Sequence, residues 1–296
     1  MMNSDTQSDG AGRSSPHPGR IDEEAYALWL QLFDAHVRRM WPGTMHGLEH
    51  LPDHNRYLVV ANHSGMGAAE LGSLIVGWRD RFGEARPVAG MAHPVGFGVP
   101  LLGYLLRGVG AVEATRQGAA WARAHEMPLL LFPGGDHEAS RPLWRANQID
   151  FAGRKGWIRL AREHGLSIVP LCITGSHVTN PILAHGKSIA WLTGLRALGV
   201  RRAPLTASAL AVAPLVYGLS RTLGLPRWLS AAGAWASMGP TLLLPYVPAR
   251  IGFHFLPPLH PERFEDSSGD DSIYAEVTGS LQQTLDVHAS SSSSSR

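Results

Sequence analysis

The sequence is poor in cysteine and in charged residues, and both shortages narrow the possible functions. Cys172 is the only cysteine among 296 residues, so no intrachain disulfide can form. Its apolar neighbours Leu171 and Ile173 indicate a buried structural thiol rather than a nucleophile. The formal net charge is only +2, and no basic stripe alternates with aromatic residues. We therefore expect no nucleic-acid partner.

Charged residues make up 17% of the chain, which leaves little polar material to cover a surface. A protein with a surface patch that contacts lipid would have such a composition, and so would a well-packed soluble enzyme. Residues 1–20 are polar and contain no apolar stretch, so we expect no signal peptide and interpret them as a disordered tail. The Ser-rich segment 289–296 predicts a second disordered tail.

The periodicity of residues 21–41 predicts an amphipathic N-terminal helix that either packs on a domain or lies on a bilayer. Short apolar runs at 57–61, 129–132 and 167–171 read as buried strands, and 117–126 and 156–165 read as helices. Alternating strands and helices are typical of an α/β fold with a mixed, mostly parallel sheet flanked by helices.

Three stretches lack charged side chains: 87–106, 203–220 and 228–249. Each approaches the length of about 20 residues that spans a bilayer. All three are interrupted by Gly and Pro, and interrupted backbone is costly where it faces lipid. We expect an acyl-chain pocket together with a surface that dips into one leaflet, while ordinary buried core remains the alternative.

His63 is the strongest candidate for chemistry, because it directly follows the first predicted strand and α/β proteins place their sites at that edge. Its ordinary pKa near neutrality suits it to accept a proton. Glu70 is the next acidic residue and could orient the ring. In a regular helix the two would lie about 10 Å apart along the axis. Contact therefore requires a loop that folds back, which Gly65 and Gly67 would permit.

Three further blocks follow along the chain. The first runs from Gly110 to Arg116, and the second is the turn Phe132-Pro133-Gly134-Gly135, whose backbone amides could bind an anion or an oxyanion. The third contains Arg154 and Lys155, which either meet a phosphate or are simply solvated, and it precedes Val169-Pro170.

Together these blocks resemble the glycerolipid acyltransferase superfamily in order and spacing, over residues 47–177. Asn62-His63 with Glu70 is similar to its histidine–acid block, and the run from Pro133 to Val169-Pro170 is similar to the mono- and diacylglycerol acyltransferase-like branch. Two departures occur. Ala68 stands where much of the superfamily has its Asp, and Pro-Gly-Gly replaces the Pro-Glu-Gly of members that use a phosphate-bearing acceptor.

The resemblance implies a membrane-associated O-acyltransferase on the cytoplasmic face. It would move a fatty acyl group from acyl-CoA or acyl carrier protein to a lipid hydroxyl, and it would need no metal or other cofactor. His63 would be the general base and Glu70 would orient it. The predicted substrate-binding residues are Asn62, Arg116, Gly134, Gly135, Glu138, Arg141 and Lys155. We expect one acyltransferase domain over 21–288, with an apolar, membrane-proximal helical segment at 188–249 that makes peripheral or monotopic contact.

Other functions fit less well. The chain has no Gly-x-Ser-x-Gly elbow of a hydrolase, and Pro181 stands where a phosphate-binding loop ending at Gly186-Lys187-Ser188 needs its first Gly. Gly47 and Pro52 interrupt the His46, His50, His54 series, which disfavours a metal site. The alternative from another class is a non-catalytic lipid-binding or carrier protein on the same scaffold. Hydrolysis of the thioester is the alternative among enzymes.

Overall fold

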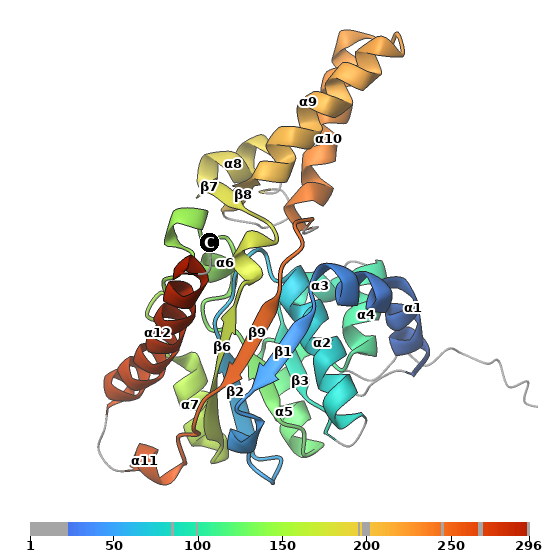
Figure 1. The fold of residues 1–296 in the computed structure, drawn as a ribbon. Coiled ribbons are helices and arrows are strands. Elements are labelled where there is room, and N and C mark those ends of the chain that lie inside the picture. Colours follow the sequence, from blue (N-terminus) through green and yellow to red (C-terminus); the bar gives the residue numbers. More distant parts are fainter. Residues whose placement is uncertain are drawn as a thin grey trace, which may run out of the picture.

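The computed structural model describes residues 23–83, 86–98, 100–194, 196, 202–243, 246–265 and 269–294. Its centre is a seven-stranded sheet in the order β1-β9-β6-β2-β5-β3-β4 (Figure 1). Neighbouring strands run parallel, except that β9 is antiparallel to β6. This confirms the predicted mixed, mostly parallel sheet. The strands are β1 (Gly43–His46), β2 (Tyr57–Ala61), β3 (Ala89–Ala92), β4 (Val112–Glu113), β5 (Leu129–Leu131), β6 (Ser167–Thr174) and β9 (Ile251–Phe255).

β2 and β6 form the middle of the sheet because their residues are apolar on both faces. Every residue of β2 is buried, and so is every residue of β6 except Thr174. Such a continuous apolar run is typical of a parallel strand covered on both sides. Val59 pairs in register with Val169 on one side and Leu130 on the other. The carboxyl ends of β2, β5 and β6 therefore meet at one edge of the sheet.

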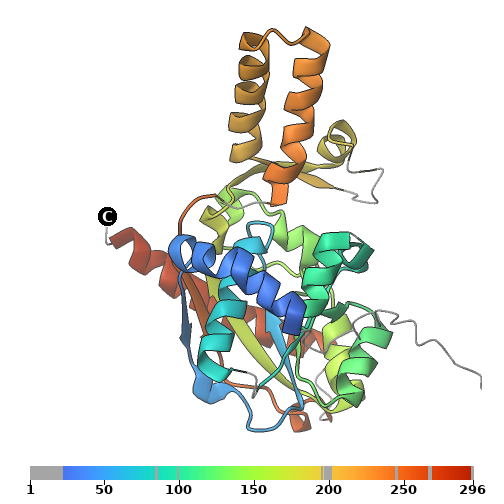
Figure 2. The same ribbon diagram turned by 90° about the vertical axis from the view of Figure 1, so that its right-hand side faces the viewer.

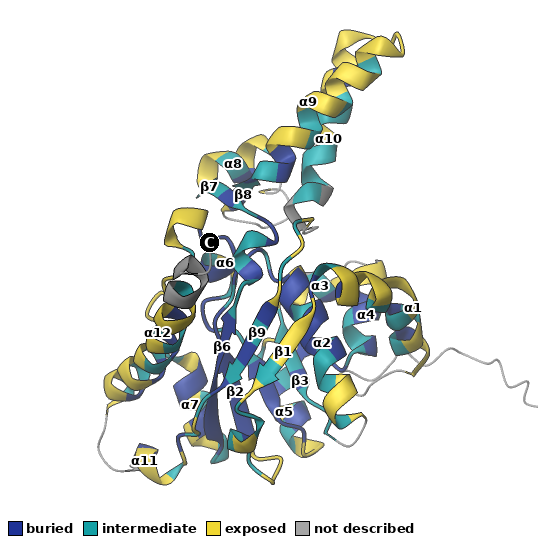
Figure 3. Ribbon diagram, in the orientation of Figure 1, coloured by how far each residue is buried: buried dark blue, intermediate teal, exposed yellow. Residues whose placement is uncertain are grey.

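Helices cover both faces of the sheet (Figure 3). One face packs against α5 (Arg116–Ala124), α7 (Gly156–His164) and α12 (Asp270–Ser294). The opposite face packs against α1 (Glu23–Met40), α2 (Ala68–Phe82) and α4 (Pro100–Gly108). The short helices are Leu48–His50, α3 (Pro94–Gly98), α6 (Gly135–Ala139), Leu143–Arg145, Ser176–Val178 and α11 (Glu262–Glu265).

The predicted N-terminal amphipathic helix is α1, and it packs on the domain. Its apolar face buries Ala25, Trp29 and Val37. Arg38 forms an ion pair with Asp80 of α2, with 2.6 Å between Nη1 and Oδ2. These contacts bear out the alternative in which the helix belongs to the protein core.

The apolar segment after β6 forms a separate extension (Figures 1 and 2). It contains a two-stranded antiparallel sheet of β7 (Ile182–Gly186) and β8 (Ala203–Thr206), with α8 (Lys187–Leu192) between them. The antiparallel helices α9 (Ala207–Thr222) and α10 (Arg227–Leu243) follow and project from the domain. Most of α9 is exposed, so the alternative that 203–220 is ordinary buried core is wrong. No helix in the described ranges is long and apolar enough to span a membrane.

The two predicted tails have different outcomes. Residues 1–20 lie outside the described residues. Helix α12 continues to Ser294, so most of the Ser-rich segment for which we expected disorder is helical. Ser has a weaker helix propensity than Ala but does not forbid a helix, and compositional bias alone could not reveal this continuation.

Candidate active site

The loop that follows β2 returns the chain so that His63 reaches Glu70. Gly65, Met66 and Gly67 have φ values of 56°, 63° and 83°, which make a tight left-handed turn. The N–H of Gly67 closes the turn by donating to the carbonyl of Ser64 at 2.9 Å. The backbone therefore folds back as predicted, and helix α2 then begins at Ala68 with Glu70 in its first turn.

His63 and Glu70 form a direct pair at the carboxyl edge of the sheet. Nδ1 of His63 donates to Oε1 of Glu70, so the neutral ring carries its proton on Nδ1 and leaves the lone pair on Nε2. Nε2 has no hydrogen-bond partner among the described residues. The His63 side chain is 14% exposed, whereas that of Glu70 is fully buried. The buried Glu70 therefore holds the ring through Nδ1, and Nε2 is left available for a substrate.

The environment of His63 favours its protonated form. Burial alone lowers the pKa of the imidazole, but the charge of Glu70 and its hydrogen bond act in the opposite direction, with a further contribution from Glu138. The net result is a pKa above the ordinary value for histidine. A raised pKa strengthens His63 as a proton acceptor while the ring is neutral.

Two neighbours fix the orientation of the imidazole. The Phe132 ring lies 4.6 Å from it between centroids, tilted by 33°. On another side, a Cβ on Gly67 would lie 2.2 Å from Cε1 of His63. Glycine is therefore required at position 67 for its backbone and for the space that the ring occupies.

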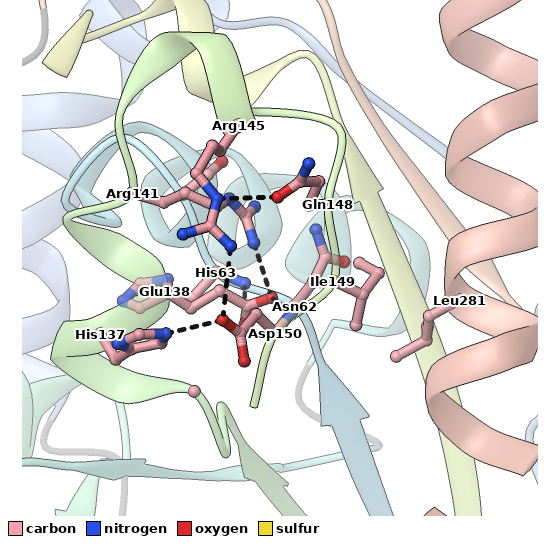
Figure 4. A network of polar contacts seen from close by, with 12 residues as sticks. Asn62, His63, His137, Glu138, Arg141, Arg145, Gln148, Ile149, Asp150 and Leu281 are labelled. Carbon is pink, nitrogen blue, oxygen red and sulfur yellow. Dashed lines mark hydrogen bonds and ion pairs between the residues drawn. The ribbon is translucent and has the colours of Figure 1, made fainter. Parts of the chain in front are cut away.

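Glu138 connects the histidine loop to the loop after α6 (Figure 4). Its Oε2 accepts the backbone N–H of His63 at 3.0 Å, and its Oε1 accepts from Arg141 at 3.0 Å and from the N–H of Asp150 at 3.3 Å. Glu138 and Arg141 are both buried. Burial raises the pKa of Glu138 to about 7, and Arg141 opposes that shift. Both residues were predicted to line the acceptor site, but they are paired with each other inside the protein.

The Pro133-Gly134-Gly135 turn uses one of its backbone amides in an internal hydrogen bond. The N–H of Gly135, which we expected to be free for an anion, donates to the carbonyl of Phe132 at 3.0 Å. A Cβ on Gly134 would lie 2.5 Å from Oε2 of Glu138, so glycine there permits the close approach of that carboxylate. Arg154 donates to the carbonyl of Gly134 at 2.8 Å and to that of Pro133 at 3.2 Å.

Two predicted substrate ligands have structural partners instead. The amide of Asn62 donates to the carbonyl of Ile173 at 2.9 Å and accepts its N–H at 2.7 Å, which ties β2 to β6. Lys155 contacts Asp271 of α12 at 2.5 Å. The neighbouring Arg154, which was considered with Lys155 as a phosphate ligand, contacts the Pro133-Gly134 turn.

Arg116, another predicted substrate ligand, has a side chain that is available to bind a ligand. It is the first residue of α5, its side chain is exposed, and it forms no hydrogen bond or ion pair within the described ranges.

Ser176 lies beside the histidine loop and was not among the residues predicted from the sequence. Its hydroxyl contacts that of Ser64 at 2.5 Å, because it follows β6 as Ser64 follows the adjacent strand β2.

Comparison with known proteins finds a family model that matches part of the chain. Residues 43–174 match the family model described as Acyltransferase, a segment that contains His63, Glu70 and the turn at Gly134. Over that segment the chain is similar to the acyltransferase family. The predicted resemblance is thereby confirmed at the level of the superfamily.

Relatives of this acyltransferase segment include uncharacterized mycobacterial proteins. One from Mycobacterium leprae is 28% identical over 149 residues, which cover 50% of this chain and 41% of that protein. One from Mycobacterium tuberculosis is 29% identical over 149 residues, which cover 50% of this chain and 42% of that protein. The chain thus spans less than half the length of these relatives.

A solved structure shares the fold. It is the 1-acyl-sn-glycerophosphate (LPA) acyltransferase PlsC from Thermotoga maritima, with a TM-score of 0.50 and 15% sequence identity. The match covers 90% of this chain and 78% of that one.

Proposed function

We propose that the protein is an O-acyltransferase that moves a fatty acyl group from a thioester donor, acyl-CoA or acyl carrier protein, to a hydroxyl of a glycerolipid or related lipid. The observation that carries this proposal is the His63–Glu70 pair, which leaves Nε2 without a partner at the carboxyl edge of the sheet. Similarity to the acyltransferase family supports acyl transfer as the reaction class.

In the proposed reaction, Nε2 of His63 accepts the proton of the acceptor hydroxyl as its oxygen attacks the thioester carbonyl carbon. The tetrahedral intermediate collapses, the carbon–sulfur bond breaks, and the thiolate takes the proton from the imidazolium. The products are an ester and a free thiol. Glu70 stabilises the imidazolium and fixes the tautomer. General base catalysis contributes about 10²–10⁴-fold, and positioning both substrates contributes further.

Two features of the chain bear on the class of lipid acceptor, and they favour different lipids. Pro133-Gly134-Gly135 is similar to the branch that acylates neutral glycerides, whereas the exposed, unpaired Arg116 could meet a phosphate.

A non-catalytic carrier would have no use for an oriented histidine with a free Nε2. We expect membrane contact at the cytoplasmic face, where the donor thioester is available.

The proposal is tested by incubating purified protein with acyl-CoA and a panel of acceptors: lysophosphatidate, lysophosphatidylglycerol, monoacylglycerol and diacylglycerol. Products are measured by mass spectrometry beside the His63→Ala variant. The proposal predicts a new ester that depends on His63. Release of free fatty acid without ester would identify a hydrolase instead, and the absence of both products with acyl-CoA and with acyl carrier protein would favour a carrier.

A further inference from the structure

The element that projects from the domain is formed by helices and carries an unusual surface. We call it the helical arm, defined as residues 187–194 and 207–243, which comprise α8, α9 and α10. The helices α9 and α10 pack against each other, and Trp235 of α10 donates to the carbonyl of Leu192 of α8 at 2.8 Å. The arm is therefore a joined unit that stands away from the main sheet (Figures 1 and 2).

Large apolar side chains on the arm are open to solvent. Leu215 is 69% exposed, Trp228 is 71% exposed and Trp191 is 71% exposed. Ten of the 18 large apolar residues that are exposed in the described ranges belong to the arm. A concentration of exposed apolar side chains of this kind points to contact with a partner or a membrane.

The charges of the arm restrict what that partner can be. No Asp or Glu occurs between Glu163 and Glu262, a stretch that holds seven of the 26 basic residues of the chain. Two of them, Arg221 and Arg227, bracket the turn between α9 and α10. An apolar surface with only positive charges matches a leaflet that contains anionic lipids, where Arg meets phosphate and Trp favours the interface.

A second copy of the chain is a poorer occupant of this surface. Two arms would bring positive charges together with no carboxylate from either arm to offset them. Helix α1 also has exposed apolar residues, Leu32 and Phe33, but it carries Glu23, Glu24 and Asp34, which anionic headgroups repel.

The helices of the arm are too short to cross a bilayer. Helix α9 has 16 residues, which corresponds to about 24 Å, less than the ~30 Å of a hydrocarbon core. Strand β7, which leads into the arm, adjoins the candidate active site, since Nδ1 of His185 donates to the carbonyl of Ser140 at 3.0 Å, next to Arg141. Membrane contact through the arm would bring lipid to the site.

We propose that the helical arm is a monotopic membrane-binding element that selects a leaflet containing anionic lipids. This inference extends the proposed function, which requires a lipid acceptor, but the binding itself needs no turnover. The apolar faces of α9 and α10 enter the interface, while Arg221 and Arg227 contact lipid phosphates.

The test is co-flotation of the full chain with vesicles of phosphatidylcholine, with or without 30% phosphatidylglycerol, at low and high salt. The double variant Leu215→Asp/Leu219→Asp should bind at least about tenfold more weakly, because it replaces apolar surface with repelled charge. Arg221→Gln and Arg227→Gln should each weaken binding to anionic vesicles about fivefold. Val287→Asp on α12, an apolar-to-acidic change outside the arm at a residue that is 60% exposed, is the control and should bind normally.

Circular dichroism and thermal unfolding establish that each variant is folded. Wild-type binding that survives Leu215→Asp/Leu219→Asp would overturn the proposal, as would equal, salt-independent binding to neutral vesicles. If the wild type binds no vesicles and is a dimer in size-exclusion chromatography, and Leu215→Asp/Leu219→Asp is a monomer, the arm serves self-association and the proposal is wrong. The His63→Ala variant should float like the wild type, so a failure of the catalytic proposal is distinguishable from a failure of this one.

Discussion

Gly67 and His63 are so close that a methyl group on Gly67 would lie 2.2 Å from Cε1 of the imidazole. The Gly67→Ala variant must therefore displace the ring as well as strain a backbone with φ of 83°. We expect a loss of kcat/KM of about a hundredfold, comparable to losing general base catalysis.

Gly83 offers a matched control for this variant. It also has a positive φ, 56°, but a Cβ there would meet nothing within 4 Å. Gly83→Ala should therefore cost about 1 kcal/mol of folding stability and leave kcat/KM unchanged. Equal activity of the two variants, measured with a thiol-release assay, would contradict the account of the histidine loop.

Replacement of Glu70 should change the pH dependence of turnover. A general base must be neutral, so the rate rises with pH through the pKa of His63, which Glu70 helps to hold above its ordinary value. Glu70→Gln should shift this acidic limb to lower pH while reducing the maximal rate. Glu262→Gln, on an exposed residue of α11, should do neither.

The same pair makes a pH-dependent contribution to folding. Because the pKa of folded His63 is raised, its stabilisation is complete below the unfolded pKa of about 6.5 and is lost as pH rises through the folded pKa. Glu70→Gln should therefore lower the melting temperature more at pH 5.5 than at pH 9. A constant difference across this range, measured by calorimetry, would show that the pair is not charged in the folded state.

The neighbours Arg154 and Lys155 should differ in their effect on activity. Arg154 donates to two carbonyls of the Pro133-Gly134 turn, so Arg154→Ala should reduce kcat/KM roughly tenfold. Lys155 pairs with Asp271 on α12, so Lys155→Ala should leave kcat/KM nearly unchanged and cost about 0–1 kcal/mol of stability. A larger loss of kcat/KM in Lys155→Ala than in Arg154→Ala would contradict this prediction and support Lys155 as a substrate ligand.

The buried pair of Glu138 and Arg141 should be structural. Arg141→Ala leaves a buried carboxylate without its partner, and we expect it to cost about 3–5 kcal/mol in denaturant unfolding. The double variant Glu138→Gln/Arg141→Met should recover part of that loss, because the single carbonyl oxygen of Gln can still accept the N–H of His63, although not that of Asp150 as well. A double variant that is no more stable than Arg141→Ala would show that charge pairing is not the main contribution.

Parts of the site were predictable because they depend on local sequence. The apolar run of β2 places His63 at a strand end, and Gly65 and Gly67 indicate the turn that returns it to Glu70. Likewise, the rhythm of strands and helices identified the mixed, mostly parallel sheet.

Other parts depend on partners that are remote in sequence. Asn62 pairs with the backbone of Ile173, and Lys155 pairs with Asp271, contacts separated by 111 and 116 positions. Strand β9 enters the sheet beside β6 only after the helical arm, so its antiparallel direction depends on how that insertion folds back. No local pattern could distinguish these roles from substrate binding.

The central claim is that Nε2 of His63 removes the proton of a lipid hydroxyl. The most direct measurement is the rate of thiol release from acyl-CoA with a saturating lipid acceptor, in the wild type and in the folded His63→Ala variant. The account predicts a loss of about 10²–10⁴-fold with an unchanged melting profile. Turnover within a factor of about two of the wild type would contradict it.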